Sequence, residues 1–202
     1  MQRSRAVFDG FRRLGCNVLV PEYPGFGLSS GKPSERGCYE AADAAWAYLQ
    51  TRPGLDRRRI VVAGWSVGGG VAVDLAARQT PAGLVVIGTT TRLQDAVRHL
   101  ADSRGSTAWI PSWFLWSITA QCRLDSVGKL PAVRCPLLVI FGERDELATK
   151  AMAERLVAAA PGGAKLVAQE GVGHGDFFKT NADALWRELD LWLGGLPAAA
   201  AR

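Results

Sequence analysis

The chain has few residues of the kinds that bind metal ions. It contains two histidines, His99 and His174, and four cysteines, and no two cysteines form a Cys-x-x-Cys pair. Structural zinc sites are normally built from such pairs, so we expect no metal site, and no residue pattern indicates a cofactor. The wide spacing of the cysteines is typical of reduced thiols rather than of a disulfide framework, which favours the cytoplasm.

Long apolar runs are also missing. No stretch approaches the roughly 18 uninterrupted apolar residues that a membrane-spanning helix needs. The first ten residues lack the apolar core of a secretion signal. We therefore predict no membrane span and, again, a cytoplasmic location.

Positive charge is in excess but is not concentrated. The net charge is +5, and the one dense basic run is Arg57–Arg59, just before a predicted strand. Surfaces that bind nucleic acids combine basic and aromatic side chains, and aromatic residues are not interleaved with this run. We interpret it as a solvated turn and predict no nucleic-acid partner.

What is present fits one globular domain over residues 1–202, with 48% hydrophobic and 21% charged residues. Short apolar runs alternate with amphipathic segments. We predict strands at 17–20, 59–63, 84–87, 137–141 and 165–168, and helices at 3–14, 36–51, 67–79, 147–160 and 181–193. This alternation predicts an α/β fold in which helices cover both faces of a mostly parallel sheet.

The strongest functional signal lies in residues 60–70. An apolar run leads directly into Gly-x-Ser-x-Gly, with Ser66 at its centre, and a helix rich in small residues follows. This is the context of a nucleophile elbow, a tight strand-to-helix turn that exposes a serine hydroxyl. Gly64 and Gly68 supply the small positions that the turn requires, and we expect the N–H of Val67 in an oxyanion hole. Glycine-rich turns of this kind also bind phosphates, so the motif alone is a hypothesis.

A catalytic serine needs a base to take its proton and an acid to orient that base. The candidate base is His174, in a glycine-rich loop after the strand at 165–168. The candidate acid is Asp145, which follows the strand at 137–141. Both loops leave the carboxyl ends of their strands, the edge at which parallel sheets place their sites. The chain order Ser, Asp, His is the one expected for such a triad.

Other residues compete for these roles. Glu143 and Glu146 flank Asp145, and Asp176 is a weaker alternative for the acid. His99 lies in an irregular segment and is expected at the surface.

Taken together, these separated signatures resemble the α/β-hydrolase superfamily, and the resemblance covers nearly the whole chain. The matching segments are Gly64–Gly69, Gly142–Asp145, Gly173–His174 and Glu22–Ser29, where Glu22 replaces an aspartate. The resemblance implies the α/β-hydrolase fold with Ser66, Asp145 and His174 as its triad. The run 30–35 before a helix is similar to small-cap serine hydrolases related to the depalmitoylating and peptidase-like members.

The resemblance also implies that a structural unit is missing. Family members carry an earlier strand ending in His-Gly, whose loop donates the second oxyanion N–H, and this chain begins after that point. We therefore expect an N-terminally truncated fold, in which 17–20 and 59–63 pair directly or leave a gap in the sheet. An open edge invites self-association. A fragment, a chain completed by a second copy and a degraded hydrolase all stay open, and the intact motifs favour the fragment.

Residues 92–130 are expected to form a small cap-like insertion. Trp113 and Trp116 are three apart, as on one helix face, and either line an acyl pocket or pack the cap onto the sheet. Trp65, next to the nucleophile, is expected to border the pocket. We predict a serine hydrolase that cleaves ester or thioester bonds of small acyl substrates through an acyl-enzyme. The alternatives are a peptidase or acyltransferase of the same fold, and an inactive domain that acts as a binding module.

Overall fold

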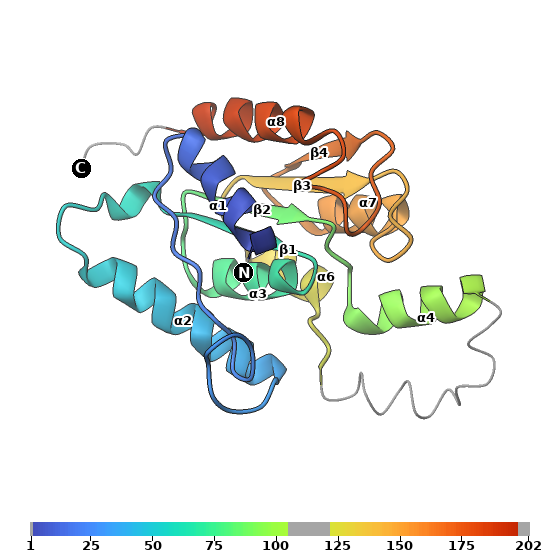
Figure 1. Cartoon of the computed structure of the whole chain (residues 1–202), viewed down its shortest axis with the longest axis horizontal. Helices are drawn as coiled ribbons and strands as arrows, with labels where there is room; N and C mark the ends of the chain where they lie inside the picture. The colour runs from blue at the N-terminus through green and yellow to red at the C-terminus, as the bar shows by residue number, and fades with distance from the viewer. Residues whose placement is uncertain (1, 105–121, 198–202) are drawn as a thin grey trace.

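The computed structural model describes residues 2–104 and 122–197 (Figure 1). Within these ranges the sheet has four parallel strands in the order β1-β2-β3-β4. The strands are β1 (Val61–Trp65), β2 (Gly83–Ile87), β3 (Leu137–Gly142) and β4 (Ala164–Gln169). The α-helices are α1 (Gln2–Arg13), α2 (Glu35–Thr51), α3 (Val67–Arg78), α4 (Leu93–Arg104), α6 (Ser126–Lys129), α7 (Lys150–Ala159) and α8 (Ala182–Gly194).

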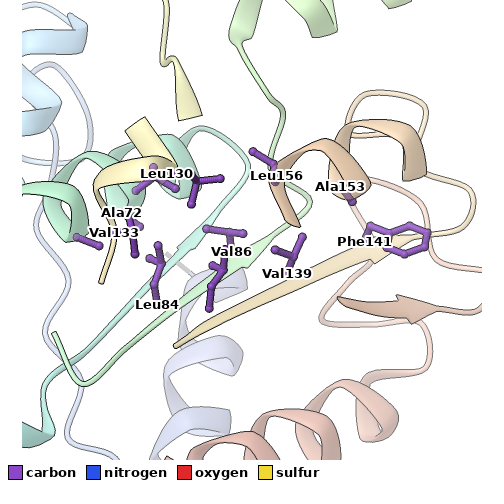
Figure 2. Packing of buried hydrophobic residues seen from close by; sticks show 12 residues of the cluster. Ala72, Leu84, Val86, Leu130, Val133, Val139, Phe141, Ala153 and Leu156 are labelled. Carbon is purple, nitrogen blue, oxygen red and sulfur yellow. The ribbon is translucent and has the colours of Figure 1, made fainter. Parts of the chain in front are cut away.

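One face of the sheet packs on α3, α7 and the turn that follows α6. Figure 2 shows Leu84 and Val86 of β2 and Val139 of β3 on the same side as Leu130 and Leu156. Each of these five side chains is at most 2% exposed. Burying a side chain of this size contributes roughly 1.5–3 kcal/mol, so this layer is a main source of stability and fixes α3 against the strands.

The opposite face packs on α8 and α1. Because side chains alternate along a strand, Val85 of β2 points away from the first layer and joins Leu185 and Leu189 of α8. Phe11 of α1 packs on the same side, with its ring edge-on to Trp186 at a centroid distance of 5.3 Å. In Figure 1, α8 and α3 accordingly lie on opposite sides of the strands. The predicted α/β architecture, with a parallel sheet covered on both faces, is confirmed.

The predicted strand at 17–20 is wrong. These residues lie outside the sheet, and Val18, Leu19 and Val20 are 38%, 44% and 52% exposed. A strand must pair its backbone N–H and C=O groups with a neighbour, and the described chain places no strand beside this segment. Within the described residues β1 pairs only with β2. Direct pairing with 17–20 is therefore excluded, and β1 is an edge strand of the described sheet.

Two further findings concern the capacity of the described helices to span a membrane and the state of the cysteine thiols. No helix within residues 2–104 and 122–197 has the length and apolar character to cross a membrane. The four cysteines all lie in these ranges and are free thiols. Burial raises the pKa of every one of them, to about 11 at Cys135, which keeps the thiols protonated at neutral pH.

A buried carboxylate ties α3 to α6 and α2. Asp74 of α3 is 7% exposed and accepts hydrogen bonds from Lys129 Nζ at 2.7 Å and from Arg78 Nη2 at 2.5 Å. Arg78 continues the network to Asp43 of α2, and Lys129 donates to the hydroxyl of Tyr39 at 2.8 Å. Paired charges of this kind are costly to break, because the remaining partner is left in a poorly solvated place.

Replacing Lys129 with methionine should lower the free energy of unfolding by about 1–3 kcal/mol, because Asp74 would keep only one cationic partner. Urea denaturation followed by circular dichroism measures the effect. The control is Arg36→Met, which removes the exposed ion pair with Glu40 and should leave the free energy of unfolding unchanged. Equal losses in both variants would contradict the role assigned to the Asp74 network.

Candidate active site

Ser66 lies at the turn between β1 and α3. Its φ is 54° and its ψ is −121°, a backbone conformation that costs a residue with a side chain about 1–3 kcal/mol. Neighbouring groups hold the turn: Ser66 N donates to Ile87 O at 2.9 Å, and Gly69 N donates to Ser66 O at 3.0 Å. The hydroxyl therefore projects from the carboxyl end of β1, as a nucleophile elbow requires.

Two glycines at this turn, Gly64 and Gly69, leave no room for a side chain, and only Gly64 was expected. A Cβ on Gly64 would overlap the backbone carbonyl of Gly68, and a Cβ on Gly69 would overlap the hydroxyl of Thr89. Gly68 itself is open, because the nearest atom to a Cβ placed there is the hydroxyl oxygen of Tyr23 at 3.8 Å. The prediction that Gly68 must lack a side chain is wrong. In the first turn of α3, the residue that faces Thr89 at the end of β2 is Gly69 and not Gly68.

A continuous chain of hydrogen bonds joins the three predicted triad residues. Ser66 Oγ lies 2.9 Å from His174 Nε2, and His174 Nδ1 lies 2.9 Å from Asp145 Oδ2. The histidine side chain is 22% exposed, whereas the aspartate side chain is fully buried. Residues 108 and 29 positions apart in the sequence thus meet at one point, at the carboxyl ends of β1, β3 and β4.

The carboxylate of Asp145 is oriented by the backbone that follows it. Its Oδ1 accepts hydrogen bonds from the N–H groups of Leu147 and Ala148, both at 2.8 Å. Because these donors hold one oxygen, the other is left to face the imidazole. Glu143, a competing acid in the sequence, instead accepts a hydrogen bond from Gly171 N at 3.4 Å.

The loops that carry Asp145 and His174 are joined to each other. Arg144 N donates to Val172 O at 3.0 Å, and Glu143 N donates to the backbone oxygen at the end of β4. These bonds extend the β3–β4 pairing beyond the strands. They hold the loop of the acid beside the loop of the base through backbone contacts.

A cavity of about 230 Å³ opens beside Ser66 and His174. Most of its wall is apolar, and it includes Val67, Gly70, Thr89, Ala96, Leu124 and Leu147. Val67 is the first residue of α3, and the N–H groups at a helix start have no acceptor within the helix. Its N–H is therefore a suitable donor to an oxyanion formed at Ser66.

Of the aromatic residues predicted to bind substrate, Trp65 is described by the structure, and it is not among the residues that line this cavity. Trp65 is 42% exposed and packs edge-on against Phe178 at a centroid distance of 5.6 Å, beside the imidazole of His174. Trp113 and Trp116 lie outside the described residues, as does the middle of the predicted cap. Their roles stay predictions.

Apart from Ser66, Val67 and His174, sequence reasoning did not identify the residues that line the cavity, and Thr89 and Leu124 are two examples. Thr89 follows β2 by two residues, so it could have been found as a residue at the same sheet edge as Ser66. Leu124 carried no local signal, because it lies near the end of the 92–130 segment and reaches the site through packing on α3, which is distant in sequence.

Comparison with known proteins decides the family. The sequence model described as "Alpha/beta hydrolase family" matches residues 3–188. The chain belongs to this family. An uncharacterized protein of Mycobacterium tuberculosis is 36% identical over 168 residues, which are 81% of this chain and 54% of that protein. Alpha/beta hydrolase domain-containing protein 17C of Mus musculus is 31% identical over 164 residues, 81% of this chain and 47% of that protein. The chain spans about half the length of these curated relatives.

Solved structures of this α/β-hydrolase fold resemble the chain in architecture. An esterase of Pyrococcus furiosus superposes with a TM-score of 0.76 at 18% identity, covering 96% of this chain and 75% of that one. A monoacylglycerol lipase of Paleococcus ferrophilus superposes with a TM-score of 0.69 at 14% identity, covering 97% of this chain and 90% of that one. At these identities the likeness is one of fold.

The crowding at the elbow predicts different effects of the same substitution at Gly64 and at Gly68. Gly64→Ala should lower the melting temperature by about 4–10 °C, because its methyl group would displace the backbone at Gly68. Gly68→Ala is the matched control and should melt within about 2 °C of the parent chain, because only an ordinary contact forms there. Thermal denaturation followed by circular dichroism measures both, and an equal loss in the two variants would contradict the described geometry.

Proposed function

We propose that this chain is a serine hydrolase that cleaves carboxylic ester or thioester bonds. The observation that carries the proposal is the hydrogen-bonded series of Ser66, His174 and Asp145. A serine hydroxyl is a weak nucleophile at neutral pH and becomes effective when an oriented imidazole takes its proton. This ordered arrangement favours an enzyme over an inactive binding module.

The proposed reaction proceeds through an acyl-enzyme. His174 Nε2 takes the hydroxyl proton as Ser66 Oγ attacks the substrate carbonyl, and the negative oxygen faces the N–H of Val67 at the positive end of α3. His174 then gives that proton to the leaving alcohol or thiol. A water molecule, activated by the same imidazole, hydrolyses the acyl-serine, while Asp145 holds the Nδ1–H tautomer throughout.

The cavity supports small acyl substrates. Its volume of about 230 Å³ and its largely apolar wall suit a short hydrocarbon group better than the polar backbone of a peptide, which would have to leave its hydrogen bonds with water unreplaced. Two of the structural neighbours are an esterase and a monoacylglycerol lipase, which agrees with an ester substrate.

The triad assignment predicts the kinetics of three variants on p-nitrophenyl butyrate. Ser66→Ala and His174→Ala should lose turnover by about 10³-fold or more, and Asp145→Asn by roughly 10³–10⁴-fold, because the asparagine holds the wrong tautomer. Initial rates at saturating ester measure kcat, and circular dichroism checks that each variant is folded.

The control for this series is Ser126→Ala, which alters another serine that lines the cavity but whose hydroxyl donates to the carbonyl of Leu124. It should retain most of the turnover. If Ser66→Ala hydrolysed the ester as fast as the parent chain, the proposed nucleophile would be wrong.

A further inference from the structure

Leu124 is unusual among the residues that line the cavity. Its φ is 42°, in the left-handed region that bulky side chains rarely adopt. It is nevertheless only 4% exposed and packs in a cluster with Val71 and Leu75 of α3. A Cβ on Gly70 would lie 3.1 Å from Leu124 Cβ, so the leucine packs closely against Gly70.

Hydrogen bonds on both sides hold Leu124 in this conformation. The preceding N–H, of Arg123, donates to Glu35 Oε2 at 2.5 Å, and the carbonyl of Arg123 accepts from Leu93 N at 3.0 Å. The carbonyl of Leu124 accepts from Ser126 N at 2.8 Å. The peptide is thus tied to α2, to the start of α4 and to α6. Strained residues persist only where the surroundings fix them in this way, and they cluster at ligand sites.

The position of Leu124 relative to the triad indicates which part of a substrate it meets. The leaving oxygen has to lie beside His174 Nε2, because that nitrogen supplies its proton. Gly70 and Leu124 line the same cavity as Ser66, and Gly70 lies about one helical turn beyond Val67, whose N–H faces the carbonyl oxygen. A chain that extends from the carbonyl carbon over Gly70 therefore runs toward Leu124.

We propose that Leu124 sets the length of the acyl group that this site accepts. A short linear acyl chain fits beside the leucine, and a longer chain meets its methyl groups. Because its peptide is fixed and its side chain is buried against Val71 and Leu75, the leucine does not swing aside for a longer ligand. The inference rests on the proposed esterase function and adds a specificity-determining residue to it.

The test is a change in acyl-chain preference. The measured quantity is the ratio of kcat/KM for p-nitrophenyl octanoate to that for p-nitrophenyl butyrate. Leu124→Ala should raise this ratio by about tenfold or more, since each additional methylene that can be buried is worth about fourfold. Leu124→Gly should raise it at least as much, because the whole side chain is removed, and glycine adopts the left-handed conformation of this position without strain.

A variant on another part of the wall tests the same idea in the opposite direction. Ala96 is 5% exposed and lines the cavity, so Ala96→Leu should fill the space and lower the octanoate-to-butyrate ratio. This variant also keeps the inference testable if the substitutions at Leu124 fail to fold.

Two controls separate cavity shape from general loosening. Leu130 is fully buried but lies outside the cavity wall, so Leu130→Ala should lower stability and leave the ratio unchanged. Butyrate esters of longer alcohols should show no altered preference in Leu124→Ala, because the leucine faces the acyl side.

The outcomes distinguish the two proposals. If the parent chain hydrolyses esters but the ratio is unmoved in folded Leu124→Ala, Leu124→Gly and Ala96→Leu, the inference is overturned and the proposed function stands. A shift confined to the alcohol series overturns it as well. If the folded parent chain hydrolyses no ester of either series, the proposed function fails and the inference falls with it.

Discussion

The contact between Ser66 Oγ and His174 Nε2 is the constraint on which the rest of the site depends. It joins two loops that follow β1 and β4, the outer strands of the described sheet. The two strands lie at opposite edges, so the loop that carries the histidine must reach back across the carboxyl ends of the strands between them. The backbone bonds between the loops after β3 and β4 hold that loop in place, and Asp145 fixes the ring.

The surrounding fold offsets the free energy that is needed to hold this contact in place. The serine at the elbow has a positive φ and is strained, and the carboxylate of Asp145 is removed from water. Two backbone N–H groups satisfy that carboxylate, and the buried layer between the sheet and α3 keeps the elbow from relaxing. The same principle recurs at Leu124, where hydrogen bonds on either side maintain a strained residue in the cavity wall.

The sequence alone was sufficient to predict the positions of residues that directly follow a strand. Asp145 and His174 could be predicted because each follows an apolar run, and parallel strands bring their carboxyl ends to one edge. The failure at 17–20 has a physical reason, since an apolar run becomes a strand only if a neighbour pairs with it. Gly69 and Leu124 depend on contacts with residues distant in the chain, which no local pattern records.

The measurement that tests the account most directly is covalent labelling with a fluorophosphonate probe, followed by mass spectrometry of the digested protein. The account predicts a single adduct on the peptide that contains Ser66, formed by the parent chain and strongly reduced in His174→Ala, where the serine is present but not activated. A folded parent chain that forms no adduct, or an adduct at Ser66 that forms equally fast in His174→Ala, would contradict the proposed activation of the serine.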